Sequence, residues 1–258
     1  MRPTTLSVRP LEGREVPACI VALGGPDTLV VTGDAASDSV LITDNGTGTL
    51  VVQATGNPTQ TFPGIANVFV GTGAGSDRVV YNLTRNLLAG QQRVLTVDLG
   101  TGNDSWTANL FNPRSGVGSD LLAGSSLIMG ITGGDGRDQM LINAQRDVDV
   151  GVGARLKMIQ FGNAGNDVIR GYYRGENDGA VAIRDFDGGS GDDIIRGLIQ
   201  EDVGSTGVSA GIEHGGEGND QMALILNTLN PPLVGEMDGG PGFDTPIATA
   251  NVTKTNFP

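Results

Sequence analysis

The sequence predicts an all-β protein that folds as a parallel β-solenoid (a β-helix or β-roll) with one glycine-rich corner in each coil. Three observations lead to this expectation. A run of the form GGxGxD, represented by GGSGDD at 188–193, recurs along the chain. Successive copies lie 24 to 39 residues apart, a spacing typical of stacked repeats. Apolar residues occupy alternate positions after each copy, as in a strand with one buried face.

Each unit begins with a strand that ends at the glycine corner. Runs rich in branched apolar residues precede the corners at 67–70, 94–97, 126–129 and 180–186. The corner itself ends at an aspartate, and these aspartates are Asp38, Asp77, Asp104, Asp138, Asp167, Asp193, Asp220 and Asp244. The copy that ends at Asp38 is degraded.

A second strand follows each corner, and a variable turn such as 174–179 or 201–207 closes the unit. Because strand side chains alternate between faces, one set of residues should be buried. This set includes Val79, Ile142, Ile169, Ile195, Met222 and Leu224. Asn82, Asn109 and Asn143 share the opposite face and should point outward or form a ladder.

An antiparallel β meander or sandwich is the alternative fold, because the same strands could alternate within one sheet. The corners would then lie about 10 Å apart along one edge, instead of about 5 Å as in a stack of coils. A fixed corner opposite a turn of variable length favours the solenoid, since insertions bulge outward without breaking the stack.

Composition restricts the partners. The formal net charge of −13 disfavours nucleic acid and anionic lipid, and favours cations. Cys19 is the single cysteine, so neither an internal disulfide nor a cysteine-based zinc site can form. No apolar run reaches the length of a membrane span.

We expect two regions: an N-terminal leader over residues 1–24, with export as its suggested role, and a single repeat solenoid domain over 25–258. The start of the chain lacks the apolar core of an ordinary secretory signal. The stretch RPLEGREVPA at 9–18 resembles a short leader on exported bacterial repeat proteins.

The corner motif resembles the hemolysin-type calcium-binding repeat, the RTX nonapeptide, which forms calcium β-helices. Complete copies stand at 133–138, 188–193, 215–220 and 239–244, and partial copies at 72–77, 99–104 and 162–167. The departure is that one motif occurs per unit of about 27 residues, whereas the family's nonapeptides run in tandem. The resemblance implies calcium at one corner of the coil, and no lipase, protease or toxin activity follows from it.

The chemistry of the corner is consistent with that implication. Calcium takes six to eight oxygen ligands, and two stacked loops could supply carboxylates and backbone carbonyls. The candidate calcium residues are Asp77, Asp104, Asp138, Asp167, Asp193, Asp220 and Asp244, with Gly134, Gly136, Gly189, Gly191, Gly216 and Gly218. The alternative is that glycine, asparagine and aspartate here simply form good turns without metal.

We therefore expect an exported, calcium-binding β-solenoid with a structural, adhesive or matrix role at the cell envelope, located outside the cell or on its surface. Calcium is the expected cofactor, and envelope polysaccharide or self-association are the expected interactions. A carbohydrate-active β-helix enzyme, a polysaccharide lyase or hydrolase, is the alternative. It would need a carboxylate pair among Asp185, Asp187, Asp192 and Asp193, or a role for His214 beside Glu213. No catalytic constellation is evident in the sequence, so we expect no enzymatic activity.

Overall fold

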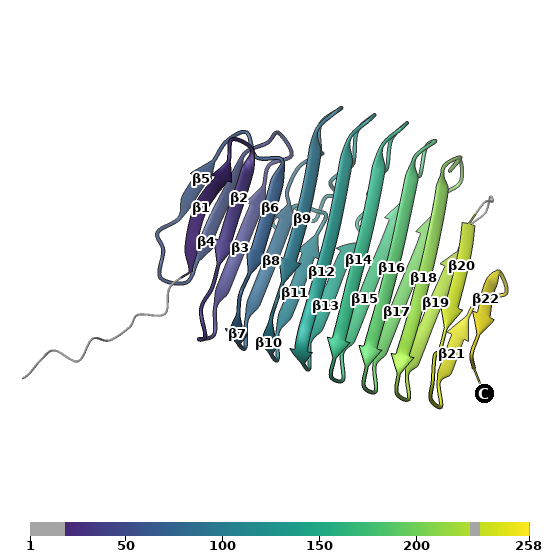
Figure 1. Ribbon diagram of the computed structural model, residues 1–258. Helices are drawn as coiled ribbons and strands as arrows, with labels where there is room; N and C mark the ends of the chain where they lie inside the picture. Colours follow the sequence, from purple (N-terminus) through teal and green to yellow (C-terminus); the bar gives the residue numbers. More distant parts are fainter. Residues whose placement is uncertain (1–18, 228–232, 258) are drawn as a thin grey trace, which may run out of the picture.

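The computed structural model describes residues 19–227 and 233–257, and these form a β-solenoid of two facing sheets without a helix. Figure 1 shows sheet A in front and sheet B behind it. Sheet A contains, in spatial order, β1 (Ile20–Gly25), β2 (Thr28–Thr32), β6 (Asn67–Gly71), β9 (Gln92–Asp98), β12 (Ser126–Gly136), β14 (Arg155–Ala164), β16 (Val181–Ser190), β18 (Val208–Glu217), β20 (Leu233–Asp238) and β22 (Val252–Thr255), with the short β7 (Ala74–Gly75) and β10 (Thr101–Gly102) beside its path. Sheet B contains β5 (Gln60–Phe62), β4 (Leu50–Ala54), β3 (Ser39–Asp44), β8 (Arg78–Leu83), β11 (Ser105–Asn109), β13 (Gln139–Ala144), β15 (Val168–Gly175), β17 (Ile194–Glu201), β19 (Gln221–Asn227) and β21 (Thr245–Ala248). No described helix is long and apolar enough to cross a membrane.

The strands of the two sheets stack in parallel, which confirms the predicted solenoid. Equivalent residues pair from coil to coil, as in Trp106 with Val79 and Met140, and Ile195 with Ile169 and Met222. The antiparallel meander is therefore wrong for the body of the molecule. The glycine corners lie along the lower edge in Figure 1, and the variable turns lie along the upper edge.

The N-terminal end of the stack is the exception, because it is built from antiparallel strands. β1 pairs with β2, while β4 pairs with both β3 and β5. The hairpin of β4 and β5 accounts for the longest step between corners, from Asp38 to Asp77. The expected boundary between residues 24 and 25 falls inside β1, and residues 1–18 of the expected leader lie outside the described residues.

The core lies between the two sheets. The six residues predicted to be buried are at most 1% exposed, and these are Val79, Ile142, Ile169, Ile195, Met222 and Leu224. On the opposite face of sheet B, the side-chain amide of Asn109 donates to Asn82 Oδ1 at 2.8 Å, and Asn143 is next in register. The predicted alternation and the asparagine ladder are both confirmed.

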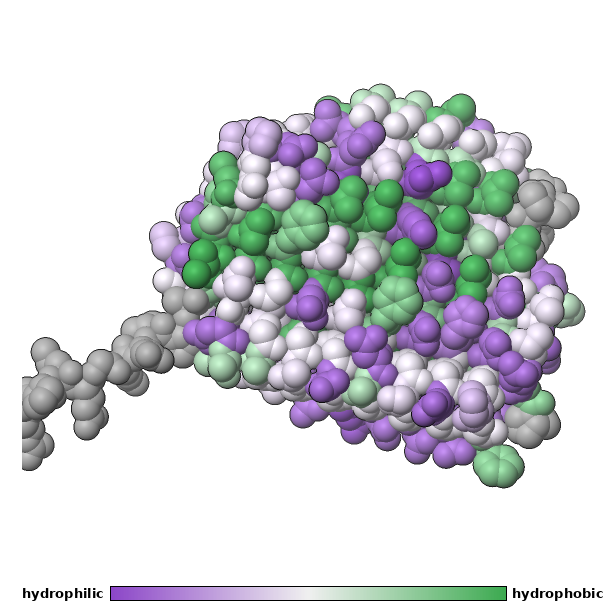
Figure 2. Space-filling view, viewed as in Figure 1, coloured by the Kyte–Doolittle hydropathy of each residue, from purple (hydrophilic) through white to green (hydrophobic). Residues whose placement is uncertain are grey.

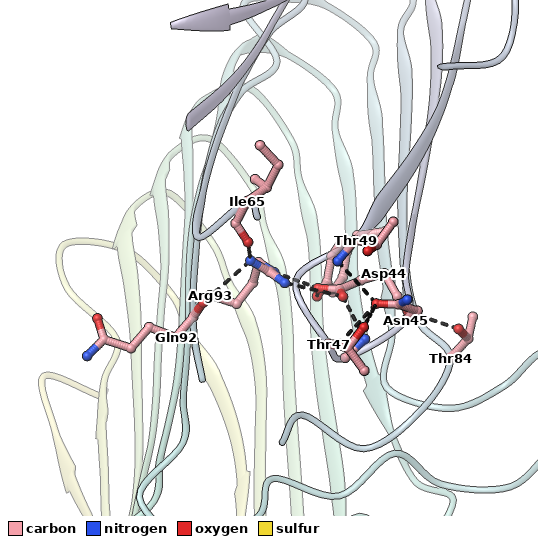
Figure 3. A network of polar contacts seen from close by, with 10 residues as sticks. Asp44, Asn45, Thr47, Thr49, Ile65, Thr84, Gln92 and Arg93 are labelled. Carbon is pink, nitrogen blue, oxygen red and sulfur yellow. Dashed lines mark hydrogen bonds and ion pairs between the residues drawn. The ribbon is translucent and has the colours of Figure 1, made fainter. Parts of the chain in front are cut away.

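One ion pair lies inside the coil near its N-terminal end. Arg93 Nε is 2.5 Å from Asp44 Oδ2, and the Tyr81 hydroxyl donates to the same oxygen at 2.7 Å. Arg93 also donates to the carbonyl of Ile65, so its buried guanidinium is anchored on both sides (Figure 3). These contacts compensate the charges of Arg93 and Asp44 in a part of the coil from which water is excluded.

The outer face of sheet A carries a group of apolar side chains, which Figure 2 shows as a green region with polar side chains inside it. We call this group the apolar band, and its members are Val30, Phe69, Val94, Ile128, Ile159, Val181, Ile183, Val208, Ala210, Ile212 and Val234. Phe69, Val208 and Val234 are each more than 40% exposed. A group of partly exposed apolar side chains on one face is typical of an interaction site.

Candidate functional site

The aspartates that end the glycine corners form one column along the stack, as predicted. We call it the aspartate ladder; it comprises Asp38, Asp77, Asp104, Asp138, Asp167, Asp193, Asp220 and Asp244. In each step the backbone N–H of one aspartate donates to Oδ1 of the aspartate in the following coil, over 2.6 to 2.9 Å. Each carboxylate therefore links two coils.

In most of the ladder the second carboxylate oxygen is buried and has no hydrogen-bond partner in the part of the chain that the structure describes. This holds for Oδ2 of Asp77, Asp104, Asp138, Asp167, Asp193, Asp220 and Asp244. All eight aspartates are at most 5% exposed. A buried charged oxygen without a partner is costly, so a proton or a cation is needed there.

In six of the eight corners the first residue is a glycine that makes room for a ladder carboxylate oxygen, whereas Thr72 and Leu99 occupy this position in the other two. A Cβ on Gly133 would lie 2.5 Å from Asp138 Oδ2, closer than any normal contact. The same relation joins Gly162 to Asp167 and Gly188 to Asp193. The sequence analysis assigned these glycines only to turn geometry and carbonyl ligation, and did not anticipate that they cover a carboxylate.

The second and third glycines of the corner lie against the neighbouring coil. At Gly191 the φ angle is +130°, and a Cβ there would overlap the carbonyl oxygen of Gly165. The other candidate glycines have the same combination of positive φ and close backbone contact, and they are Gly134, Gly136, Gly189, Gly216 and Gly218. Neighbouring loops also share backbone hydrogen bonds, for example from Asp135 N to Gly100 O at 3.0 Å.

Burial makes the ladder hold protons more tightly than free aspartate. Desolvation raises the pKa of Asp104, Asp138 and Asp220 to about 6, and that of Asp193 to about 7. The N–H of the neighbouring aspartate opposes each shift, while the nearby carboxylates add to it. The raised pKa values mean that the ionised ladder carboxylates have no nearby positive charge, among the described residues, to stabilise them.

A hard cation would fit the donor set, which consists of carboxylate and carbonyl oxygens. Within 19–227 and 233–257, however, no group of three or more His, Cys, Asp or Glu side chains could hold a metal ion. Backbone carbonyls would therefore have to complete the shell. The ladder is compatible with ion binding, and the candidate residues are brought together at one corner.

A second, shorter ladder lies at the variable turns. Asp120 N donates to Asn86 Oδ1, Asp149 N to Asp120 Oδ1, and Glu176 N to Asp149 Oδ1, all within 3.1 Å. This second ladder was not predicted from the sequence. The signal was present, because these acids are 29 and 27 residues apart, like the corner aspartates.

The fold divides the acids considered as a catalytic pair, but Asp185 and Asp187 lie together on the outer side of β16. Asp193 lies inside the ladder, whereas Asp192 is exposed and accepts from the backbone and side chain of Asn219 at 2.9 and 3.0 Å. Asp187 is on the outer side of sheet A, in register with His214. Glu213, the neighbour of His214, is fully buried.

No protein-family profile, curated protein or solved structure matches the chain significantly. Its class is therefore given by its own geometry, which is that of a β-solenoid with coils of about 27 residues and a ladder of buried aspartates.

Proposed function

We propose that this protein is an exported, calcium-binding solenoid with a structural or adhesive role at the cell envelope. The aspartate ladder carries this proposal, because its buried carboxylates each keep one oxygen without a partner. Coils repeat about every 4.8 Å, and two unit charges at that distance repel by roughly 3 kcal/mol at an effective dielectric of 20. Cations along the column would remove this repulsion.

Calcium is the cation that agrees best with the donors. It accepts an irregular shell of carboxylate and carbonyl oxygens, whereas magnesium requires a strict octahedron and gives up water reluctantly. The resemblance of the corners to calcium-binding RTX repeats supports the same choice. Sites with a Kd near 0.1 mM, in the range of extracellular modules, would each add about 1.4 kcal/mol at 1 mM calcium.

The apolar band supports the structural or adhesive role, with a second copy of this chain as its occupant. From β2 to β20 the band is roughly 34 Å long, and its three rows of side chains are roughly 13 Å wide, by strand spacing and rise. Pairing two bands would bury about 900 Å², the size of a weak, transient interface. Lys157 on β14 and Asp185 on β16 lie near its centre, so a two-fold axis between them would place each Lys157 opposite the second copy's Asp185.

The calcium proposal is tested by thermal unfolding of the full chain in chelator, in 1 mM calcium and in 1 mM magnesium. Several sites together should raise the Tm by about 10 °C or more in calcium, and by much less in magnesium. Asp193→Asn should reduce the rise, because it removes one ladder charge while preserving the shape of the side chain.

Asp192→Asn is the matched control, since Asp192 is the exposed neighbour that lies outside the ladder. It should leave the calcium response almost unchanged. A Tm that is the same in chelator and in calcium would reject the calcium proposal. The ladder would then be neutralised by protons, and the corners would be turns.

A further inference from the structure

A two-lobed cleft lies on the outer side of sheet B near its N-terminal end. One lobe, of about 500 Å³, includes Asn45, Thr47, Asn86 and Ser115, and the other, of about 430 Å³, includes Thr43, Asn82 and Arg114. Thr84, Arg85 and Asn112 line both lobes. We call this the arginine cleft. Its lobes have the size of small-molecule sites.

One wall of the arginine cleft comes from an inserted hairpin. Phe111 and Gly118 form an antiparallel bridge, and the chain between them contributes Asn112, Arg114 and Ser115. This insertion explains the long step of 34 residues between Asp104 and Asp138. Figure 3 shows Asn45, Thr47 and Thr84 of the other wall, together with the internal Asp44.

The charge of the arginine cleft is opposite to that of the whole chain. Arg85 and Arg114 are exposed and form no ion pair with any described residue, and no carboxylate lines either lobe. The nearby acids are engaged elsewhere, Asp44 with Arg93 and Asp120 with Asn86. Two unpaired guanidinium groups thus remain in a protein of net charge −13.

The rest of the lining is suited to a sugar. Amide and hydroxyl groups provide both donors and acceptors, and Leu88 and Val117 provide small apolar contacts. The row that contains Asn82 continues across the sheet through Asn109 and Asn143 to Tyr172. A linear polymer that starts in the cleft would meet amides and then an aromatic ring.

We propose that the arginine cleft binds an acidic sugar unit of a polysaccharide. Arg85 and Arg114 bind its carboxylate through paired hydrogen bonds, a geometry for which guanidinium is preorganised. The asparagines and threonines bind its hydroxyls, and the Asn82 row extends the contact along the chain. This site includes no residue of the aspartate ladder, so it stands whether or not the ladder binds calcium.

Isothermal titration of the full chain with a galacturonic acid hexamer tests the proposal, with the methyl-esterified hexamer as the uncharged comparison. The acid should bind at least tenfold more tightly than the ester. Arg85→Gln and Arg114→Gln should each weaken binding of the acid about tenfold or more, because a hydrogen bond to a charged group is lost. Both side chains are exposed, and unchanged Tm values will show that both variants fold.

Arg137→Gln is the control, because Arg137 is an equally exposed arginine at the glycine corner, outside the cleft. It should bind like the unaltered protein. Equal weakening by Arg137→Gln, or equally tight binding of a single-stranded oligonucleotide, would overturn the proposal in favour of general attraction to polyanions. Failure of the hexamer to bind would overturn it as well. Parallel titrations with sodium sulfate test for binding of a free anion, and titrations with dextran sulfate test for binding of a sulfated sugar. Tighter binding of either than of the galacturonic acid hexamer would reject a carboxylated sugar as the ligand.

Discussion

Three polar side chains on sheet A point into the coil, and their terminal groups have no hydrogen-bond partner among the described residues: Gln160, Arg184 and Glu213. The guanidinium of Arg184 lies 4.3 Å from the ring centre of Tyr173, and desolvation lowers the pKa of Arg184 to about 10. Desolvation raises the pKa of Glu213 to about 8, while the backbone of Gly197 close to its carboxyl group opposes the shift in part. Glu213 is therefore a neutral acid at pH 7.

Glu213→Gln should change how stability depends on pH. The folded pKa of Glu213 lies above its unfolded value, so its contribution is fully present below about 4.5 and is lost as the pH rises toward about 8. Across that window Glu213 should lower the free energy of unfolding by about 1.4 kcal/mol per pH unit. Glutamine mimics the neutral acid, so the variant should lose this slope.

Urea unfolding at several pH values between 5 and 8, in chelator, measures the slope. Glu236→Gln is the control, since Glu236 is exposed on β20. If Glu213→Gln and Glu236→Gln show the same pH dependence as the unaltered chain, Glu213 is not a buried neutral acid.

Among the elements, the glycine corners are the most constrained, because adjacent loops are in backbone contact. β10 pairs in parallel with both β7 and β12, so the loops themselves extend sheet A. Hydrogen bonds from loop to loop and from aspartate to aspartate hold each corner to the next. The variable turns are less constrained, since Gly179 has open space around its Cβ position.

Gly191→Ala should destabilise the fold by about 3 kcal/mol or more. Its φ of +130° is accessible almost only to glycine, and the added methyl would overlap the Gly165 carbonyl. Gly179→Ala, at φ +63° with no neighbour, should cost only about 1 kcal/mol. The urea unfolding midpoints of the two variants measure this difference. Equal losses of stability would show that neighbouring glycine corners are not in backbone contact.

At the scale of the whole molecule, the two outer faces differ in chemistry. Sheet A carries the apolar band, while sheet B carries the asparagine ladder, the in-register pair Arg170 and Arg196, and the arginine cleft. Two faces with different surfaces suit a protein that pairs on one side and binds a polymer on the other. This arrangement agrees with the structural or adhesive role proposed above.

The apolar band should make the full chain a weak dimer, populated as the concentration is raised to about 100 µM and measured by sedimentation. Ile159→Glu should shift the equilibrium to monomer, because it places a charge in the middle of the band. Ile225→Glu, on the outer side of sheet B, is the matched control and should leave the dimer intact. A monomer at every concentration, or equal effects of both changes, would contradict pairing through the band.

The sequence by itself determined the coil. Period-two alternation identified the buried residues from Val79 to Leu224, and the repeated motif placed one glycine corner and one aspartate in each unit. These features depend on local backbone geometry, which is determined by residues that are close together in the sequence.

Only the tertiary structure decided the contacts between coils. It showed that Oδ1 of Asp193 accepts from Asp167, that Gly188 covers the other oxygen, and that Arg93 pairs with Asp44. It also joined Arg85 and Arg114 in one cleft. Apart from the contact within a single corner, the residues in these pairs lie far apart along the chain. The period-two alternation predicts the face of the sheet on which a residue lies, but not the atom that it contacts. The stacking of the coils brings those atoms together, because neighbouring strands lie only about 4.8 Å apart.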